Sequence, residues 1–560
     1  MVTRCAIYSP SGFGTPENPF GKDVANLGLF RAIARHSGYS DINFLLHAQT
    51  PPEQVAQALL GRERTATRIN TGGLLSVGRM RESGVLLRGK ADLADLAWLR
   101  RGAGSDRDFS LVGLVHCIAP PALRRYIADA ATAPVQPWDA LICTSPVVRD
   151  NLARMFEGVS DHLSSRFGGS RPPSPPMPAL PVIPLGVDVE RFARAADRPD
   201  VREATRTRMQ LGPDDVLVLW VGRLSFFEKA FPQPMFQAVA EAAARTGKRI
   251  HFAMAGWFPA GETGRQEYAD AARLHAPGVT VHLLDGRKSE TVDALWSASD
   301  IFLSLVDNVQ ETFGITPIEA MAAGLPVVVS DWDGYRANVV DGEQGFLVET
   351  LGGPAGLGAT MLQRHVFGLD SYQNYVGNVA QHTAIDIGAA ADAIGRLAGD
   401  PELRRRFGEA GRRHARERYD WPVIVRQIDG LFDELAALRQ DAAAFEAGSA
   451  LARQDPVRCE PFGDFAEFAT NVLSGSTRLR ARAGVTEASV ARLATVGLNR
   501  FGGMWRPRAE ATTALLRAVV EHPDRDVEAI LAGFPNEPRQ PLQAALMWMC
   551  KYGLLDWKTG

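Results

Sequence analysis

The chain has 560 residues, of which 46% are hydrophobic and 22% are charged, and its formal net charge is −3. This length is typical of about three to four domains, and the near-neutral charge argues against a nucleic-acid partner bound through a generally basic surface. The five cysteines lie far apart without a C-x-x-C pair, which argues against a disulfide framework or a zinc site. Because no signal peptide and no run of about 18 apolar residues occur, we expect a cytoplasmic chain that could sit at the inner membrane face.

Residues 1–190 are predicted to form an N-terminal Rossmann-like acceptor domain. A strand over 4–9, a glycine-rich loop and a helix over 22–36 follow one another as at the start of an α/β nucleotide-binding fold. Apolar runs predict further buried strands over 42–47, 111–116, 140–144 and 181–185. Helical patterns cover 98–101 and 123–131. Segment 167–181 is dense in Gly, Ser and Pro, which predicts a loop.

Residues 191–420 are predicted to form a second Rossmann-like domain, which would hold the donor. The expected strands cover 216–221, 250–255, 279–284, 301–305 and 326–330. The expected helices cover 235–246, 291–297 and 316–323. This alternation with short loops is typical of a doubly wound parallel sheet. Two such domains in tandem imply a cleft between them, which is a preferred place for a ligand.

The rest of the chain is predicted to be mainly helical. Segment 352–382 is expected to be an irregular insertion, and helices are expected over 385–397, 401–419 and 422–439, with 421–440 as a linking helix. Residues 441–560 are expected to form a helical accessory domain with helices over 511–520, 527–531 and 541–549. The last segment suggests a winged-helix-like unit by analogy of fold alone, which does not license DNA binding.

The segment Glu311-Thr-Phe-Gly-Ile-Thr-Pro-Ile-Glu319 carries the strongest chemical signal. Thr316 before Pro317 predicts that a helix starts here with Thr316 as its N-cap. Gly314 lets the backbone approach a ligand closely. The N–H groups at such a helix start, from Gly314 through Ile315 to Thr316, suit a diphosphate.

The two glutamates of this segment differ in how they can be interpreted. Glu311 lies on the loop, has no evident structural duty, and could accept hydrogen bonds from sugar hydroxyls. Glu319 lies one turn into the helix and could accept hydrogen bonds from ribose hydroxyls. It could equally form a capping box with Thr316, and the local sequence leaves both interpretations open.

Three further features could contribute to a ligand site. Arg223 and Lys229 follow the strand over 216–221 and could hold a pyrophosphate, although both could also lie on a solvated loop. His116 ends the strand over 111–116, where it could contact a ligand or satisfy a structural hydrogen bond. The loop over 11–21, which contains Gly12 and Gly14, lacks the G-x-G-x-x-G spacing, so we expect a flexible loop at the cleft.

Together these features resemble the retaining glycosyltransferases of family 4, which have the GT-B fold of two Rossmann-like domains facing across a cleft. The resemblance covers about residues 1–440 and is dense over 181–350. It is carried by Pro184-Leu-Gly-Val-Asp-Val-Glu-Arg-Phe192, Val221-Gly-Arg-Leu224 with Lys229, Ala255-Gly256, the segment from Glu311 to Glu319, and Gly324-Leu-Pro-Val327.

The resemblance implies a role for each residue that matches the family pattern. Arg223 and Lys229 match the basic pair that binds the donor diphosphate. Glu311 matches the glutamate that contacts the donor sugar, and Glu319 the one that contacts the ribose. His116 looks like the histidine near the transferred sugar. Gly21 with its loop looks like the glycine region near the acceptor and the phosphates, and Gly256 is taken as a further donor-side glycine.

The activity implied by the resemblance is sugar transfer from a nucleoside-diphosphate sugar to a glycan, lipid-linked or small-molecule acceptor. Retention of configuration is expected, with no metal and no cofactor beyond the donor substrate. A nucleotide-sugar-binding scaffold without turnover and a nucleotide-sugar epimerase on the same fold stay open. The chain departs from the family pattern in a longer Arg223–Lys229 segment, a missing Gly-Gly pair and a missing Pro-Ser before Glu311.

A basic segment lies outside this resemblance. Residues 476–508 contain Glu487 as their only acidic residue, with Phe501 and Trp505 interleaved among the arginines. These arginines are Arg478, Arg480, Arg482, Arg492, Arg500, Arg506 and Arg508. The pattern favours either a peripheral membrane or polyanion contact, or a solvated face whose arginines are paired within the fold.

Overall fold

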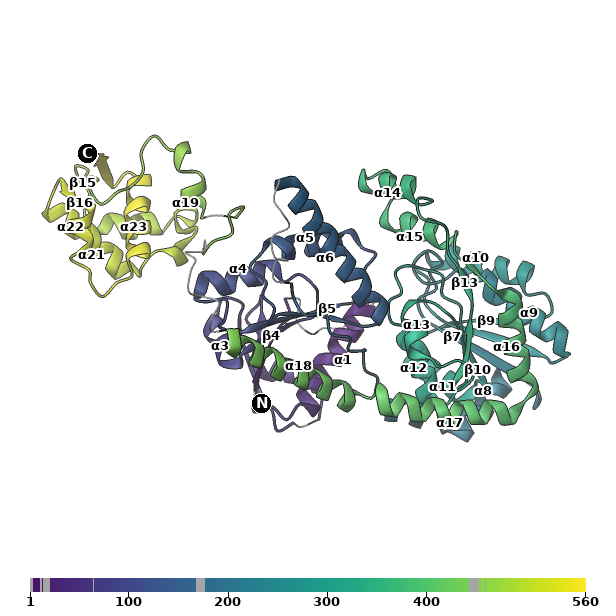
Figure 1. The fold of residues 1–560 in the computed structure, drawn as a ribbon. Helices are drawn as coiled ribbons and strands as arrows, with labels where there is room; N and C mark the ends of the chain where they lie inside the picture. The colour runs from purple at the N-terminus through teal and green to yellow at the C-terminus, as the bar shows by residue number, and fades with distance from the viewer. Residues whose placement is uncertain are drawn as a thin grey trace. The chain divides into compact units, whose positions relative to one another are not determined.

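The computed structural model describes residues 4–10, 13, 21–63, 65–167, 177–442, 453–458 and 460–559. The chain divides into two compact units, Met1–Gln454 and Asp455–Gly560 (Figure 1). The glycine-rich loop expected before residue 21 and most of the loop expected over 167–181 lie outside the described residues.

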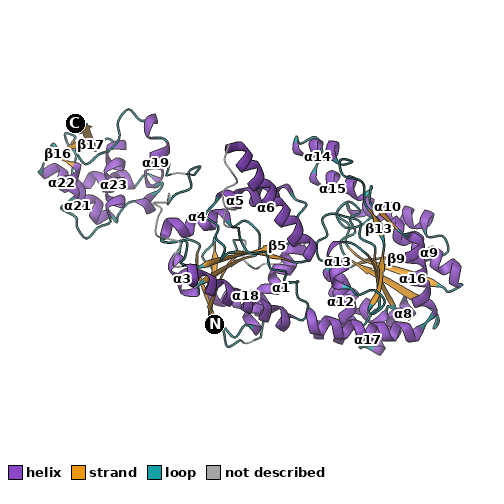
Figure 2. Cartoon of the chain, in the orientation of Figure 1, coloured by secondary structure: helices purple, strands orange, loops and turns teal. Residues whose placement is uncertain are grey.

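The first sheet of unit one is parallel, with the strand order β3-β2-β1-β4-β5-β6. Its strands are β1 (Arg4–Tyr8), β2 (Asp41–Leu46), β3 (Arg68–Gly73), β4 (Val85–Arg88), β5 (Ser110–Val115) and β6 (Ala140–Cys143). Its helices are α1 (Gly21–His36), α2 (Pro52–Leu60), α3 (Val77–Ser83), α4 (Ala94–Ala103), α5 (Pro121–Thr132) and α6 (Pro146–Phe167). Helices cover both faces of the sheet (Figure 2), which is why its central strands β1 and β4 are apolar, apart from Arg4 and Arg88 at their ends.

The strand predicted over 181–185 is wrong. This segment runs beside β6 and forms only isolated parallel bridges, from Ala179 to Ala140 and from Val182 to Cys143. Pro181 and Pro184 have no N–H group, so the segment cannot form a continuous ladder. It therefore covers the edge of the sheet without becoming a strand.

The second sheet of unit one repeats this design, with the order β12-β11-β10-β7-β8-β9. Its strands are β7 (Val216–Val221), β8 (Ile250–Gly256), β9 (Thr280–Asp285), β10 (Ile301–Ser304), β11 (Val327–Ser330) and β12 (Gly345–Val348). Its helices are α7 (Val189–Ala196), α8 (Pro199–Arg208), α9 (Gln233–Thr246), α10 (Gly261–His275), α11 (Ser289–Ala298), α12 (Ile315–Ala323) and α13 (Asp333–Asn338). Counted from its own first strand, each sheet has the Rossmann order 3-2-1-4-5-6, which confirms the predicted fold class with two Rossmann-like sheets.

The irregular insertion predicted over 352–382 is wrong, because the segment contains two helices. These are α14 (Ala359–Val366) and α15 (Tyr372–Ala380), and the short antiparallel pair β13 (Thr350–Leu351) and β14 (Ala384–Ile385) closes the excursion. Helix α14 buries none of its residues. It therefore lacks the buried apolar stripe from which a helix is predicted in a sequence.

The chain then returns to the first domain. Helices α16 (Ile387–Gly399) and α17 (Pro401–Arg418) pack on the second domain, whereas α18 (Trp421–Asp441) places Ile424 and Phe432 in the core of the first. Where it crosses, Asp420 forms a parallel bridge with Val187, so the outgoing and returning connections lie side by side. Trp421 packs there against Gly186, at which an added Cβ would lie 2.3 Å from the indole ring.

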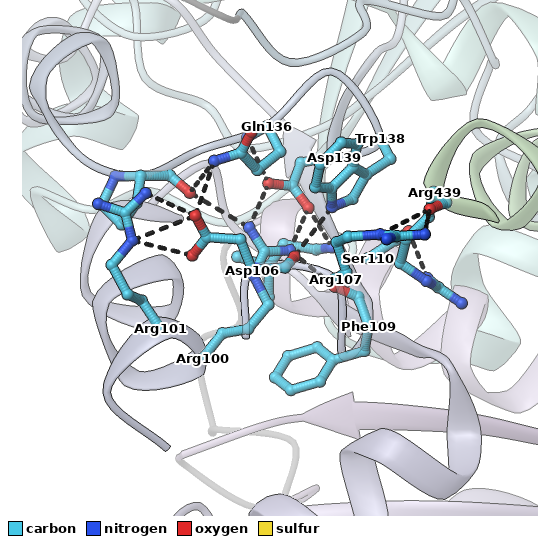
Figure 3. Close-up of polar contacts among 12 residues, drawn as sticks. Arg100, Arg101, Asp106, Arg107, Phe109, Ser110, Gln136, Trp138, Asp139 and Arg439 are labelled. Carbon is cyan, nitrogen blue, oxygen red and sulfur yellow. Dashed lines mark hydrogen bonds and ion pairs between the residues drawn. The ribbon is translucent and has the colours of Figure 1, made fainter. Parts of the chain in front are cut away.

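The end of α18 is tied to the first domain by arginines (Figure 3). Arg439 donates to Gly84 O at 2.6 Å and to Ser110 Oγ at 2.7 Å, and Arg107 donates to Arg439 O at 3.0 Å. Beside them Arg100 and Asp139 form a fully buried pair at 2.7 Å. Asp139 also accepts from the Leu111 amide, so its charge is both paired and hydrogen-bonded.

Unit two is mainly helical with a small antiparallel sheet of order β16-β15-β17. Its strands are β15 (Arg478–Ala481), β16 (Arg525–Asp526) and β17 (Leu555–Lys558). Its helices are α19 (Pro461–Asp464), α20 (Glu487–Ala494), α21 (Ala509–Glu521), α22 (Val527–Leu531) and α23 (Arg539–Lys551), with short 3-10 turns η2 (Ala466–Phe468), η3 (Gly497–Arg500) and η4 (Gly503–Trp505). It has a core of its own around Leu479 and Leu515. Within the described ranges, no helix of either unit is long and apolar enough to cross a membrane.

Candidate functional site

The topology of the second sheet brings the predicted donor residues together. Strand β7 lies between β8 and β10, so the segments after β7 and β10 leave the sheet side by side at its carboxyl edge. This position is the topological switch point at which open α/β sheets bind ligands. Arg223 follows β7 and Glu311 follows β10. Lys229 Nζ lies 3.2 Å from Glu311 Oε2 across this position.

Glu311 has a structural duty, so the expectation that it has none is wrong. Its Oε1 accepts from the amides of Gly314 at 2.9 Å and Phe313 at 3.4 Å, while Oε2 accepts from Lys229. Burial raises the pKa of this carboxyl, but the Lys229 ammonium and the two amides outweigh burial and hold it below the ordinary value. Glu311 is therefore a charged group that also shapes the turn before α12.

The start of α12 differs from its prediction. The helix begins at Ile315 with Gly314 as its N-cap, so the predicted Thr316 cap is wrong. Gly314 has φ 78°, and an added Cβ would lie 1.8 Å from Tyr335 Cε1. Only glycine takes this backbone conformation without strain and leaves room for the tyrosine ring. The Thr316 hydroxyl is hydrogen-bonded to the Tyr335 side chain.

This geometry resolves the ambiguity of Glu319. The cap position carries no side-chain hydrogen bond, so Glu319 and Thr316 do not form a capping box. Burial raises the pKa of Glu319 to about 7, against a smaller lowering by Arg191. Its carboxyl has no hydrogen-bond partner among the described residues, and neither do the amides of Ile315 and Thr316. A desolvated carboxyl and two helix-start donors thus lie within one turn of each other.

The basic pair is present but carries carboxylate partners. Arg223 Nη1 lies 3.0 Å from Glu228 Oε2, and only 13% of the Arg223 side chain is exposed. Lys229 is paired with Glu311 as described. Both cations are therefore held in place before any ligand arrives, and a diphosphate would share them with the two glutamates. The solvated-loop alternative does not fit Arg223, which is mostly covered and paired with Glu228.

Gly256 has a packing role at the neighbouring strand end. An added Cβ would lie 1.8 Å from Gly222 O, immediately before Arg223, and the Gly286 amide donates to Gly256 O at 2.9 Å. A larger residue would therefore push the Arg223 segment away from the sheet. This contact explains the glycine without any ligand.

His116 belongs to a polar network at the switch point of the first sheet. Its Nε2 lies 2.9 Å from Asn26 Oδ1 and 3.2 Å from Gly89 O, and Asn26 Nδ2 donates to the same carbonyl at 3.0 Å. Because a carbonyl only accepts, we infer that Nε2 carries the proton. Burial lowers the pKa of His116 to about 4 despite the Gly89 hydrogen bond, so the ring is neutral.

The backbone of His116 joins the first domain to the donor turn. Thr312 Oγ1 donates to His116 O at 2.6 Å. The adjacent Cys117 interacts electrostatically with Glu311, and burial raises its pKa to about 12. The structure therefore places the end of β5 against the turn before α12. Gly21 is the first residue of α1, the helix that carries Asn26, and an added Cβ there would meet nothing within 4 Å.

The sequence interpretation missed the segment after β11, which supports the donor turn. Asn338 donates to Phe313 O at 2.5 Å, and Tyr335 is hydrogen-bonded to Ser304 at 2.9 Å. Asp333 accepts from Ser145 Oγ at 2.9 Å, and burial raises the pKa of Asp333 to about 7. The available signal was the run Asp331-Trp-Asp-Gly-Tyr335 directly after a buried strand.

A cavity of about 410 Å³ that is lined in part by Asp333 lies between the two domains. The first domain lines it with Ile118, Arg124 and Met155, and the second with Trp332, Arg336 and Tyr375. Another cavity, of about 360 Å³, lies beside Ala322 near the end of α12, away from the turn at Gly314. No cluster of three or more His, Cys, Asp or Glu side chains suited to a metal occurs among the residues that the structure describes.

Residues 201–351 match the family model described as glycosyl transferases group 1. This segment is therefore similar to the group 1 glycosyl transferases. The matched segment contains Arg223, Lys229, Glu311 and Glu319. His116 and Gly21 lie outside it, in the first domain.

Two relatives illustrate how far the similarity extends. The D-inositol 3-phosphate glycosyltransferase of Corynebacterium efficiens is 26% identical over 257 residues, which cover 46% of this chain and 51% of the relative. The phosphatidyl-myo-inositol mannosyltransferase of Mycobacterium leprae is 36% identical over 126 residues, which cover 22% and 24%. The chain thus spans about half the length of the first relative.

Solved structures with a similar arrangement include HepE of Anabaena in complex with UDP-glucose. It is 16% identical with a TM-score of 0.47, over 77% of this chain and 99% of that structure. Sucrose-phosphate synthase of Thermosynechococcus elongatus is 18% identical with a TM-score of 0.45, over 78% and 100%.

Proposed function

We propose that this chain is a glycosyltransferase that moves a sugar from a nucleoside-diphosphate sugar to an acceptor, with retention of configuration and without a metal. The observation that carries the proposal is the meeting of Arg223, Lys229, Glu311 and the start of α12 at the switch point of the second sheet. Glu319, whose carboxyl has no hydrogen-bond partner among the described residues, lies one turn further along the same helix.

The reaction breaks the bond between the sugar and the diphosphate, so negative charge grows on the leaving phosphate. Arg223, Lys229 and the amides of Ile315 and Thr316 are preorganised donors for that charge. Losing one donor of this kind costs about 3 kcal/mol in the barrier. Two cations and a helix start oppose the diphosphate charge without a metal ion.

The carboxyl groups and the histidine would orient the donor. Glu319 would accept from the ribose hydroxyls, because its carboxyl finds no hydrogen-bond donor in the part of the chain that the structure describes. Glu311 would accept from a sugar hydroxyl while it stays bound to the Gly314 amide. His116, neutral and fixed by Asn26, would contact the transferred sugar. In the retaining reaction the leaving phosphate takes the acceptor proton, and no other base is assigned.

The acceptor would enter through the cavity between the two domains. Its walls combine apolar side chains such as Ile118 and Met155 with the cations Arg124 and Arg336. A glycan, a lipid-linked sugar or a small molecule would fit this description, and the cavity would shield the donor from water. We place the reaction in the cytoplasm, with peripheral contact at the inner membrane face as part of the proposal.

The first experiment is a thermal-shift screen with UDP-, GDP- and ADP-sugars. A donor at about 100 times its dissociation constant stabilises its domain by about 2.7 kcal/mol. The selected donor is then used to compare sugar transfer by the wild type and Glu311→Ala, with substitution of the exposed Glu262 in α10, Glu262→Ala, as the matched control. We expect transfer to be lost only in Glu311→Ala.

Four outcomes would contradict the proposal. If no nucleotide sugar raises the midpoint of thermal unfolding, the chain has no donor site of the proposed kind. Wild-type transfer by Glu311→Ala would remove the role of Glu311, and donor binding without transfer to any acceptor would favour a scaffold or an epimerase. Activity abolished by EDTA and restored by magnesium would disprove metal independence.

A further inference from the structure

A short apolar loop in unit two faces solvent. The loop is the segment from Val496 to Trp505, which contains the turns η3 and η4. Four large apolar side chains project from it, with exposed fractions of 83% for Leu498, 91% for Phe501, 83% for Met504 and 69% for Trp505. Single exposed apolar residues are ordinary on a protein, but four within eight positions form a patch that indicates a partner.

The loop is held from its inner side by polar contacts. Asn499 donates to Leu493 O at 3.0 Å, and its own carbonyl accepts from Trp548 Nε1 at 2.9 Å. The Arg506 guanidinium lies 4.7 Å from the centre of the Trp548 ring and also donates to Asn499 O. These anchors fix the backbone, so the outward direction of the apolar side chains is part of the fold.

The sequence around the loop is positively charged. From Ala488 to Arg508 the sequence has four arginines and no acidic residue, in a chain of net charge −3. Arg492, Arg500 and Arg508 are exposed and make no ion pair among the described residues. By contrast, the neighbouring Arg480 pairs with Asp524, and Arg482 pairs with Asp556. The interpretation as paired arginines therefore applies to Arg480 and Arg482 and not to the loop.

We propose that the apolar loop inserts into the surface of a membrane that contains anionic lipids. Phe501 and Trp505 would lie at the level of the headgroups and upper acyl chains, where aromatic rings are favoured. The exposed arginines beside them would pair with lipid phosphates. Leu498 and Met504 favour a lipid surface over a nucleic acid, because aliphatic side chains offer no stacking platform for bases. This inference does not depend on the proposed sugar transfer.

Co-sedimentation of the full-length protein with vesicles tests the proposal. We expect binding to vesicles of phosphatidylglycerol and phosphatidylcholine to exceed binding to phosphatidylcholine alone, and to fall with salt. The double variant Phe501→Ser and Trp505→Ser should weaken binding at least tenfold. Each of Arg500→Gln and Arg508→Gln should weaken it about fivefold. The matched control is Phe367→Ser, which changes a phenylalanine that is 78% exposed in unit one.

Insertion is measured separately from folding by the conservative variant Trp505→Phe. This variant should bind normally but lose part of the tryptophan fluorescence that brominated lipids quench in the wild type. Equal binding to neutral vesicles, equal losses in Phe367→Ser and the loop variant, or unchanged quenching in Trp505→Phe would each overturn the proposal. Binding to an acidic protein or to RNA without binding to vesicles would overturn it as well.

Discussion

Replacing Gly314 by alanine tests how the donor turn is built. Gly314 combines two requirements, a φ of 78° and a Tyr335 ring that occupies the place of a side chain. Gly247 ends α9 with φ 64° and meets only the first requirement, because an added Cβ there would contact nothing within 4 Å. Comparing the two alanine variants therefore separates backbone strain from the contact with Tyr335.

The expected magnitudes follow from these geometries. A positive φ costs alanine about 1 kcal/mol or slightly more, so this is the whole effect expected for Gly247→Ala. At Gly314 the Cβ would lie 1.8 Å from the ring, so Tyr335 has to move and lose its hydrogen bond to Ser304. Overpacking of this kind adds about 1–3 kcal/mol. Gly314→Ala should therefore destabilise its domain by about 3 kcal/mol.

Differential scanning calorimetry gives the first measurement. For a domain of this size, about 3 kcal/mol lowers the midpoint by about 9 °C, and about 1 kcal/mol lowers it by about 3 °C. Donor affinity gives the second measurement, because a displaced turn also moves the Ile315 and Thr316 amides. Equal midpoints for the two variants, or unchanged donor affinity in Gly314→Ala, would refute the reasoning.

Two further predictions concern a carboxyl and an arginine. Because burial raises the pKa of Glu319 to about 7, its ionisation disfavours the fold increasingly as the pH rises from its unfolded value toward 7. The midpoint advantage of Glu319→Gln over the wild type should therefore grow between pH 5 and pH 7; a constant difference would contradict it. Arg439→Met removes two hydrogen bonds from a cation and should cost about 3 kcal/mol, measured as faster amide exchange at Ser110. The exposed Arg426→Met on the same helix should leave this exchange unchanged.

The sequence predicts best where periodicity is local. Strands β7 and β8 are apolar runs between turn signals, and both lie within a residue of their predicted bounds. Strand β3 was not predicted because its sequence, Arg-Ile-Asn-Thr-Gly-Gly, contains no apolar run. It lies at the edge of the sheet. Helix α14 was not predicted because none of its residues is buried, so it has no buried apolar stripe. The apolar run over 181–185 is not a strand, because Pro181 and Pro184 have no N–H group to donate, and it covers the edge of the sheet instead.

The sequence predicted which residues belong to the candidate site better than it predicted the contacts that they make. The sequence indicates that Arg223, Lys229, Glu311 and Glu319 belong together, and the sheet order places their segments at one edge. It could not show that Glu311 would bind the Gly314 amide, because that depends on the turn conformation. The supporting Tyr335 reaches Gly314 only because β11 pairs with β10, a long-range contact that local patterns do not encode.

The path of α18 has a consequence for how the first domain can be isolated. Its core is assembled from two stretches of sequence, one that ends near Val187 and one that begins at Trp421. A gene fragment cut after the first stretch would leave the surface that Ile424 and Phe432 cover open to water. The first domain is therefore a discontinuous folding unit, and an independent version would need α18 joined to it by a designed linker. Since residues 187 and 420 are neighbours, that linker could be short.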